Sequence, residues 1–532
     1  MKNFRKYVAG LCLLGIGVLS VSSCEIKEEV EDELTQDVVF GADGGTTQLV
    51  APVYASLRDL MKQDGVFGVN EHASDEMLGP TRGQDWDDNG VWRVLHTHNW
   101  DATNAFIQNS WNDLNRGISR ANSALAVLLE AEDTPENARL IAETRTLRAL
   151  YSFYVLDMFG QLPFRENDDT NFTEPGQVLT GQEAFNYIET ELQESIPDLG
   201  NEGEVTYGRM TKGAANTLLA VLNLNHATYL GAEDPARYED VITYTDAVIS
   251  SGNYSLADDY FSIFDNDNTA TRGAGEAIIV SEFTNSEDLA VANQLFNNMT
   301  LHYNQRWGNG FSAWNGFTTI ADFYNRFDES DARFLDTTRP VNGINRGFLR
   351  GQQTNGEGQF ILERGGESFL VDDLADADVP GLNYTLDVDL TGNTESNGVR
   401  VIKYEPDASS PIQNRANYDY IIYRLADVYL MRAEANYRTG DNGAALADIN
   451  IVRQARGVNN VSTVDDDVIL NERGYELYWE GHRRRDLIRF GRFGETWNLK
   501  EQSPEFRQLF PIPQNSIDSD PNLKQNPGYA GG

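Results

Sequence analysis

Apolar residues recur every three or four positions along several long stretches of this 532-residue chain. This spacing places them on one face of an α-helix. Between Trp111 and Leu129, for example, Leu114, Ile118 and Leu125 fall on one such face. The same spacing, which begins near Pro52, predicts helices over residues 111–129, 137–159, 181–196, 212–230, 236–250 and 442–456, and a further helix that starts at Tyr420.

Residues before several of these stretches are typical of helix starts. Thr134-Pro135 and Asp234-Pro235 each offer an N-cap side chain followed by a proline in the first turn. Thr180 and Glu183 have the spacing of a capping box, in which each side chain bonds the backbone N–H of the other residue. Together with the periodicity, these signals favour a mainly α-helical protein.

The predicted helices come in pairs, each with a helix rich in Ala, Leu and Tyr, then a turn and a second helix. The pairs resemble degenerate tetratricopeptide repeats, without a strict register of about 34 residues. Because one pair cannot bury its apolar face alone, the pairs must stack on one another. We therefore expect a scaffold in which residues 137–159 pair with 181–196, 212–230 with 236–250, and 421–438 with 442–456.

The pattern changes between residues 255 and 418, where Gly, Asn, Asp and aromatic residues dominate. This segment is too long to be one loop of a compact domain. Short strands are predicted at Ala277–Glu282 and Val399–Tyr404, and Gly347–Leu370 has room for a hairpin. The expected organisation is a leader at 1–23, a tether at 24–50, a helical scaffold with ligand loops at 51–254, an irregular loop-rich subdomain with a few short strands at 255–418, and a second helical scaffold at 419–532.

The N-terminus has the pattern of an export signal. A basic start at residues 2–6 precedes an apolar run from Val8 to Val21, which is shorter than the about 20 residues that span a bilayer. Small residues then lead to Cys24, as in a lipoprotein processing site, and an ordinary signal peptide with a chance cysteine is the alternative. Because Cys12 leaves with the leader, Cys24 has no internal disulfide partner, which favours lipidation.

The formal net charge of −40 at pH 7 excludes some classes of partner. Nucleic acid needs a basic surface for its phosphates, so no nucleic-acid partner is expected. Polyanionic ligands are disfavoured for the same reason, whereas acidity keeps a surface soluble in salt. The charge therefore favours an uncharged ligand.

Tryptophans and polar residues gather in two clusters without helical periodicity, at residues 70–90 and 303–317. A sugar ring stacks its C–H face on an indole, while its hydroxyls pair with amides, carboxylates and guanidinium groups. Rigid aromatic residues on adaptable loops suit such a ligand. The predicted glycan-binding residues are the stacking rings Trp86, Trp307 and Trp314 and the hydroxyl-binding residues Asn70, Asp85, Asn309 and Tyr303.

Packing against the scaffold is the alternative role for the loop tryptophans. It is also the expected role for Trp92, Trp100, Trp111, Trp479 and Trp497. An acidic row near the C-terminus invites a catalytic interpretation, but a structural one is favoured. Its members Glu472, Glu476 and Glu480 have the spacing of a single helical face, where nearby arginines offset the repulsion between like charges.

Enzymatic and metal sites have weaker support in the sequence. Glycoside hydrolysis needs two carboxylates about 5–10 Å apart, and the candidates Glu71, Asp75 and Glu76 belong to an acid-rich chain that produces such pairs freely. His96-Thr97-His98 lacks a third metal ligand. The Asp265–Asn268 stretch lacks the glycine and distal glutamate of an EF-hand loop. No catalytic residue, metal or cofactor is therefore predicted.

Five segments follow one another near the C-terminus: Tyr420–Ala435, the helical stretch Ala444–Arg456, Glu472–Arg483, Pro511-Ile512-Pro513 and Asn522–Tyr529. Together they resemble the SusD/RagB family of outer-membrane nutrient-binding lipoproteins of Bacteroidetes. Arg484 departs from the family pattern, because members often carry an aromatic residue there, and the departure touches packing only.

The resemblance implies a tetratricopeptide-like scaffold, an aromatic platform on the two loop clusters, and acylation of Cys24. Lys27-Glu28-Glu29 resembles the signal that sends such lipoproteins to the cell surface, so the protein is expected on the outer membrane, held by its lipid alone. The implied function is capture of a neutral oligo- or polysaccharide and its delivery to a SusC-like TonB-dependent transporter, without catalysis. A glycoside hydrolase, a peptide-binding RagB-like uptake protein and a scaffold that binds only protein are the alternatives.

Overall fold

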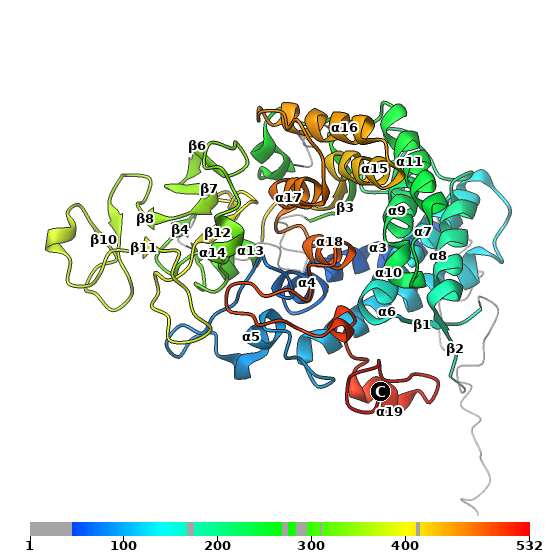
Figure 1. Cartoon of the computed structure of the whole chain (residues 1–532), viewed down its shortest axis with the longest axis horizontal. Helices are drawn as coiled ribbons and strands as arrows, with labels where there is room; N and C mark the ends of the chain where they lie inside the picture. The colour runs from blue at the N-terminus through cyan, green and yellow to red at the C-terminus, as the bar shows by residue number, and fades with distance from the viewer. Residues whose placement is uncertain (1–44, 167–174, 269–274, 284–294, 309–310, 411–414) are drawn as a thin grey trace, which may run out of the picture. The chain divides into compact units, whose positions relative to one another are not determined.

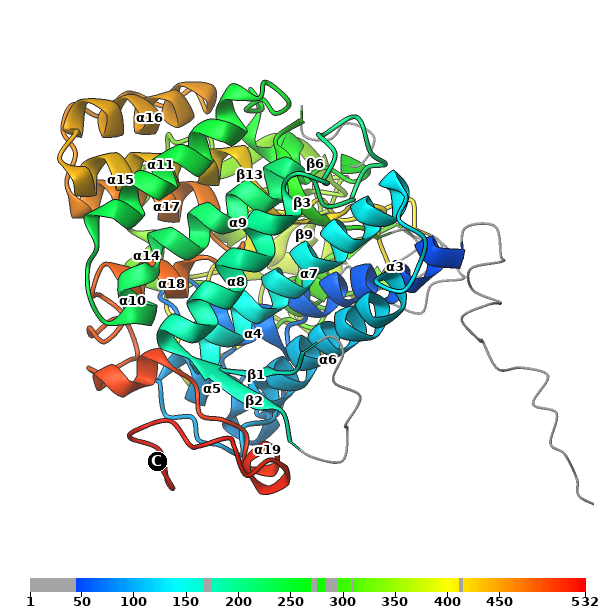
Figure 2. The ribbon, with the colours of Figure 1, turned by 90° about the vertical axis from the view of Figure 1, so that its right-hand side faces the viewer.

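Long helices, each packed on the next, form the scaffold (Figure 2). The computed structural model describes residues 45–166, 175–268, 275–283, 295–308, 311–410 and 415–532, and the chain from Thr46 onward forms one compact unit. The helices of this series are α6 (Ala105–Leu128), α7 (Pro135–Phe159), α8 (Gly181–Ser195), α9 (Lys212–Leu224), α11 (Pro235–Ser250), α15 (Leu425–Thr439) and α16 (Asn442–Ala455). The predicted pairs are confirmed as α7 with α8, α9 with α11 and α15 with α16, and the mainly helical class is confirmed with them.

Two of the three predicted caps are present. The side chains of Thr134 and Asp234 each accept a hydrogen bond from a backbone N–H in the first turn, and a proline follows each of them. The capping-box prediction at Thr180 is wrong in its bonding. Helix α8 does begin after Thr180, but that side chain makes no capping hydrogen bond.

Two predicted helices are not continuous helices in the structure. The helix expected at 212–230 is interrupted at Asn225, after which the short helix α10 (His226–Leu230) follows. The segment Tyr420–Arg424 is not helical but forms strand β13, which pairs antiparallel with β3 (Ala277–Ser281). All its residues are buried, so its apolar pattern has no exposed face by which to tell a strand from a helix.

The segment between residues 255 and 418 consists mainly of short strands and loops beside the helices (Figure 1). Its three-stranded sheet joins β12 (Arg400–Ile402), β7 (Ile344–Leu349) and β6 (Leu335–Val341) in that order. The strands predicted at 277–282 and 399–404 are confirmed as β3 and β12. Within the predicted hairpin at 347–370, an antiparallel bridge joins Thr354 to Phe360. The strands are β4 (Arg306–Trp307), β5 (Phe311–Ser312), β6 (Leu335–Val341), β7 (Ile344–Leu349), β8 (Gly351–Gln352), β9 (Phe360–Ile361), β10 (Leu370–Val371), β11 (Asn383–Tyr384) and β12 (Arg400–Ile402).

Shorter elements join the scaffold to the loop-rich segment. Helix α18 (Arg483–Arg489) contacts both α4 (Val66–His72) and α17 (Asp466–Leu477), so the N-terminal and C-terminal parts of the compact unit meet there (Figure 1). Within the described ranges, no helix combines the length and apolarity needed to cross a bilayer. These elements are α3 (Gly45–Ala55), α4 (Val66–His72), α5 (Val91–His96), β1 (Gln161–Phe164), β2 (Gln177–Thr180), α13 (Leu295–Thr300), α14 (Ala321–Tyr324), α17 (Asp466–Leu477), α18 (Arg483–Arg489) and α19 (Gln514–Ser519).

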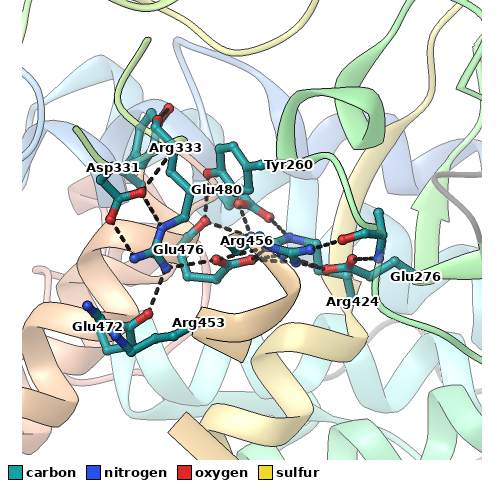
Figure 3. Close-up of polar contacts among 12 residues, drawn as sticks. Tyr260, Glu276, Asp331, Arg333, Arg424, Arg453, Arg456, Glu472, Glu476 and Glu480 are labelled. Atoms are coloured by element: carbon teal, nitrogen blue, oxygen red, sulfur yellow. Dashed lines mark hydrogen bonds and ion pairs between the residues drawn. The ribbon is translucent and has the colours of Figure 1, made fainter. Parts of the chain in front are cut away.

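A buried ion network ties the C-terminal helices to the loop-rich segment (Figure 3). The Glu476 carboxylate accepts hydrogen bonds from Arg424 at 2.6 Å, Arg456 at 2.7 Å and Arg333 at 3.0 Å. All four residues are buried, with exposures of 0–2%. The arginines come from β13, from the end of α16 and from the loop before β6, so one carboxylate joins three distant parts of the chain.

The acidic row near the C-terminus is therefore structural, but its geometry differs from the prediction. Glu472 and Glu476 lie in α17, whereas Glu480 lies beyond the end of that helix, after Trp479 in a left-handed conformation (φ 57°). The expectation that all three glutamates share one helical face is wrong, because the helix ends before the third. Glu480 still joins the network by accepting a hydrogen bond from Arg424 at 2.8 Å.

Candidate functional site

Trp86 and Trp314 lie together on two loops that are far apart in the sequence. The Trp86 indole N–H donates a hydrogen bond to the Trp314 carbonyl at 2.7 Å. Trp314 is 37% exposed, and Trp86 is half-buried. Both residues are thus held in place while part of each remains accessible to solvent.

The backbone shapes the position of the Trp86 ring. Trp86 has a φ of 62°, a left-handed conformation that is uncommon for a bulky residue and is found preferentially at functional sites. It follows a tight turn in which Arg82 and Asp85 exchange backbone hydrogen bonds. The ring lies directly against Gly316, where an added Cβ would approach it to 2.3 Å, and it contacts Phe317 at 5.4 Å between ring centroids. This close approach requires a glycine at position 316.

A polar cluster of Asp85, Tyr303, Arg364 and Glu395 lies beside Trp86, which follows Asp85 in the chain. Asp85 accepts hydrogen bonds from the Tyr303 hydroxyl at 2.5 Å and from Arg364 Nη2 at 2.6 Å. Arg364 Nε donates to Glu395 at 2.8 Å, and the guanidinium carbon lies 3.6 Å from the centroid of the Tyr303 ring. We call the rings of Trp86, Trp314 and Tyr303 the aromatic ledge, and Arg364 with Asp85 and Glu395 the Arg364 clasp.

Both carboxylates of the clasp stay ionised at neutral pH. Partial burial acts to raise the pKa of Glu395, but hydrogen bonds from His302 and Arg364 outweigh it and lower that pKa to about 2. Hydrogen bonds from Tyr303 and Arg364 lower the pKa of Asp85 below its ordinary value. Burial lowers the pKa of His302, so this imidazole is neutral at pH 7 and Arg364 supplies a cation to both carboxylates.

The structure brings together four of the predicted site residues, Trp86, Trp314, Asp85 and Tyr303. The expectation that Trp307 presents its ring to a ligand is wrong, because Trp307 is 0% exposed and belongs to a buried apolar cluster of the loop-rich segment. Asn70 is likewise inaccessible at 2% exposure, and its amide donates to a backbone carbonyl within α4. The predicted residue Asn309 lies outside the described residues.

Arg364 and Glu395 are absent from the sequence prediction. Each lies far along the chain from both tryptophan clusters and belongs to no motif, so no local signal marks either residue. The core roles predicted for the other five tryptophans are confirmed, since their exposures lie between 1% and 7%: Trp92, Trp100, Trp111, Trp479 and Trp497.

The carboxylates considered for glycoside hydrolysis serve packing instead. Asp75 accepts two hydrogen bonds from the Arg483 guanidinium, at 2.7 and 2.9 Å. Glu71 and Glu76 accept backbone N–H groups of residues 479–481, and all three carboxylates are 1% exposed. A sugar has no access to them in this structure.

The stretches considered for metals are also committed to structural contacts. His96 and His98 are buried beside backbone carbonyls at 2.9 Å, and Asp265 pairs with Arg346 at 2.6 Å. In the part of the chain that the structure describes, no group of three or more His, Cys, Asp or Glu side chains is arranged to hold a metal ion.

Cavities elsewhere on the described surface do not involve the ledge. One of about 610 Å³ lies between α3, residues 206–209 and the end of β3, and others of about 390 and 310 Å³ lie near α17. Their linings contain no ledge residue. Flat rings beside ionised carboxylates and a guanidinium instead offer both a stacking surface and hydrogen-bonding partners, which is what a hydroxyl-rich ring requires.

Stacked helix pairs with a loop-borne aromatic ledge define a tetratricopeptide-like helical protein with a surface site. Sequence models of two families match the chain. The model described as the SusD family matches residues 262–529, about half of the chain, and the one described as "Starch-binding associating with outer membrane" matches residues 41–224. The chain belongs to the SusD family, which confirms the resemblance seen in its C-terminal segments.

Similar proteins match over nearly the whole chain. The starch-binding protein SusD of Bacteroides thetaiotaomicron is 28% identical over 488 residues, which cover 87% of this chain and 85% of that relative. Surface glycan-binding protein A of the same organism, solved in complex with laminarihexaose, matches at a TM-score of 0.65 and 20% identity over 91% of this chain and 99% of its own. A SusD superfamily protein of Parabacteroides distasonis matches at a TM-score of 0.70 and 20% identity, covering 92% of this chain and 100% of its own.

Proposed function

We propose that this protein is a cell-surface glycan-binding lipoprotein that captures a neutral oligo- or polysaccharide and delivers it to a SusC-like TonB-dependent transporter. The observation that carries the proposal is the aromatic ledge, in which Trp314 and Trp86 are fixed at the surface beside Asp85 and Tyr303. Membership of the SusD family supports it, as do the names of relatives that bind starch or laminarihexaose.

The energetics of the ledge suit capture followed by release. Each well-formed aromatic stack contributes about 1 kcal/mol beyond the area that it buries. Two or three such stacks, with hydrogen bonds that replace bonds to water, give modest affinity and fast dissociation. A protein that hands its ligand to a transporter benefits from both properties.

Trp314→Ala is expected to weaken glycan binding roughly tenfold, because it removes the most exposed ring of the ledge. Affinity gels that contain starch or laminarin measure the effect as a loss of retardation. Leu129→Ala is the matched control, since Leu129 is 50% exposed at the end of α6 and lies outside the ledge. Wild-type retention that Trp314→Ala leaves unchanged would contradict the site.

The same incubations separate the proposed function from its alternatives. Assayed for new reducing ends, the wild-type protein is expected to release none, because the candidate hydrolytic carboxylates are buried. Turnover that Glu71→Gln abolishes would instead make the protein a hydrolase. A wild-type chain that no glycan gel retards would favour peptide capture or a role as a protein-binding scaffold.

Cys24 lies outside the described residues. The proposed lipid anchor is supported by the N-terminal sequence pattern and by the family, and the proposed transporter partner by the family alone. Cys24→Ser is expected to abolish labelling by radioactive palmitate and to release the protein from the outer-membrane fraction. A TonB-dependent barrel that co-purifies with the wild-type protein is expected not to co-purify with this variant. Cys12→Ser, a change in the leader, is expected to leave all three readouts unchanged. Persistent labelling of the Cys24→Ser chain would refute the anchor.

A further inference from the structure

The rings of the aromatic ledge differ in how much of their surface a ligand can reach. Trp314 is 37% exposed. Tyr303, by contrast, is half-buried, and the Arg364 guanidinium carbon lies 3.6 Å from its ring centroid. At that distance a planar guanidinium is in stacking contact with the ring. The ring face that Arg364 covers is therefore already occupied.

The Arg364 side chain is held in this position by the clasp. Its Nε and Nη2 donate to Glu395 and Asp85, at 2.8 and 2.6 Å, and its backbone N–H donates to Glu395 at 2.7 Å. These contacts direct the guanidinium donors at carboxylates of the protein. Two of the five N–H donors of the guanidinium are engaged in this way, and they fix its plane over the Tyr303 ring.

The clasp is a surface feature and can open at small energetic cost. The side chains of Arg364, Asp85 and Glu395 are 48%, 42% and 21% exposed, and ion pairs with this degree of exposure contribute little to stability. The backbone beside Arg364 is fixed independently, by hydrogen bonds from the Leu362 N–H to the Phe369 carbonyl and from the Glu363 N–H to the Pro380 carbonyl. Uncovering Tyr303 therefore takes a side-chain movement rather than rearrangement of the loop.

Tyr303 is nevertheless joined to the tryptophan end of the ledge. Its hydroxyl bonds Asp85, the residue before Trp86, and its carbonyl accepts the Ser312 hydroxyl at 2.8 Å, two residues before Trp314. A chain of sugar rings that extends from the tryptophans along these loops meets the covered tyrosine.

We propose that Arg364 is a specificity-determining residue that masks Tyr303, so that only a glycan long enough to reach beyond Trp86 and Trp314 displaces it. This inference rests on the proposed glycan-binding function. Short oligosaccharides bind on the tryptophans alone and are indifferent to the clasp. Long oligosaccharides contact the third ring, Tyr303, only when the guanidinium moves aside. Their observed affinity is therefore reduced by the fraction of protein molecules in which Arg364 still covers Tyr303.

The inference is tested by titrating the purified protein with malto-oligosaccharides and laminari-oligosaccharides of increasing length. Arg364→Ala is expected to tighten the binding of the longest members roughly three- to tenfold and to leave the shortest members unchanged. Tyr303→Ala in the Arg364→Ala background is expected to remove the gain, because the uncovered ring is then absent. Arg364→Lys, which keeps the charge but lacks the flat guanidinium, is expected to shift affinity in the same direction and decides the matter if Arg364→Ala fails to fold.

Arg350→Ala is the matched control, because Arg350 is also exposed and lies over a tyrosine ring, that of Tyr324, at 5.6 Å. It is expected to leave every affinity unchanged. Weaker binding of long oligosaccharides by Arg364→Ala would overturn the inference and make Arg364 a direct ligand of the sugar, and unchanged binding would overturn it as well. The proposed function fails separately, if the wild-type protein binds none of these glycans.

Discussion

Glu476→Gln is expected to lower the free energy of unfolding by about 3–5 kcal/mol, the loss that follows removal of one partner from a buried ion pair. The substitution keeps the size of the side chain but removes the charge that three guanidinium groups share. Arg333, Arg424 and Arg456 would each lose one of the carboxylates with which they pair in the interior. The carboxamide also presents an N–H₂ group toward donors, which removes an acceptor that the arginines require.

The position of Glu476 in the fold explains why so large an effect is expected from one atom exchange. Burial acts to raise the pKa of Glu476, but the three arginines outweigh it and hold that pKa well below its ordinary value. The ionised carboxylate is thus stabilised by the fold, and it joins α17, β13, the end of α16 and the loop before β6. Breaking the network loosens contacts between parts of the chain that are otherwise far apart.

Urea denaturation followed by tryptophan fluorescence measures this loss. Glu495→Gln is the matched control, because Glu495 pairs with Arg492 at the surface with 53% of its side chain exposed, and removal of an exposed pair costs about 0–1 kcal/mol. If the two substitutions destabilise the protein equally, the buried ion network around Glu476 does not stabilise the fold more than an exposed ion pair does.

The helical scaffold could be predicted because amphipathic helices carry their own signal. Positions such as Leu114, Ile118 and Leu125 alternate with polar residues at a spacing that only a helix satisfies. The same reasoning fails at Tyr420–Arg424, a strand buried on both faces. A run of apolar residues with no polar side has no periodicity, and its partner strand β3 lies more than a hundred residues away.

The candidate site could be predicted only in part, because its loops lack periodicity. Trp307 and Trp314 occur in similar stretches of Gly and Asn, yet one is fully buried and the other is 37% exposed. What separates them is packing of the loop-rich segment, which depends on residues far along the chain. Arg364 and Glu395 reach the ledge for the same reason, through contacts that no local pattern records.

Acidification from pH 7 to pH 5 is expected to lower the free energy of unfolding, because buried histidines resist protonation. Burial lowers the pKa of His72 from its ordinary 6.5 to about 3, and that of His482 to about 4. It also lowers the pKa values of His96, His98 and His302. Between pH 5 and pH 7 the histidines of the unfolded chain bind protons, whereas the buried histidines of the folded chain stay neutral. The free energy of unfolding that they contribute therefore rises with pH across this interval.

Two buried carboxyl groups act in the opposite direction. Burial raises the pKa of Glu71 to about 7, and it also raises that of Glu76. The folded protein therefore retains protons that the unfolded chain loses above pH 4.5, and the stability that these groups contribute falls as pH rises toward 7. Burial lowers the pKa of five histidines, whereas it raises the pKa of these two glutamates. We therefore expect the histidines to determine whether stability rises or falls with pH.

His72→Gln isolates one contribution to the slope of the free energy of unfolding against pH. His72 lies beside Trp92 and Phe317, with ring centroids 5.0 and 4.7 Å away, and its Nδ1 lies 2.9 Å from the Gly68 carbonyl. Glutamine retains a donor for that carbonyl but takes up no proton, so the variant is expected to lose up to about 1.4 kcal/mol per pH unit of the slope. Urea denaturation at a series of pH values measures it. Equal stability of the wild-type protein at pH 5 and pH 7, or an unchanged slope in the variant, would show that buried imidazoles do not govern its response to acid.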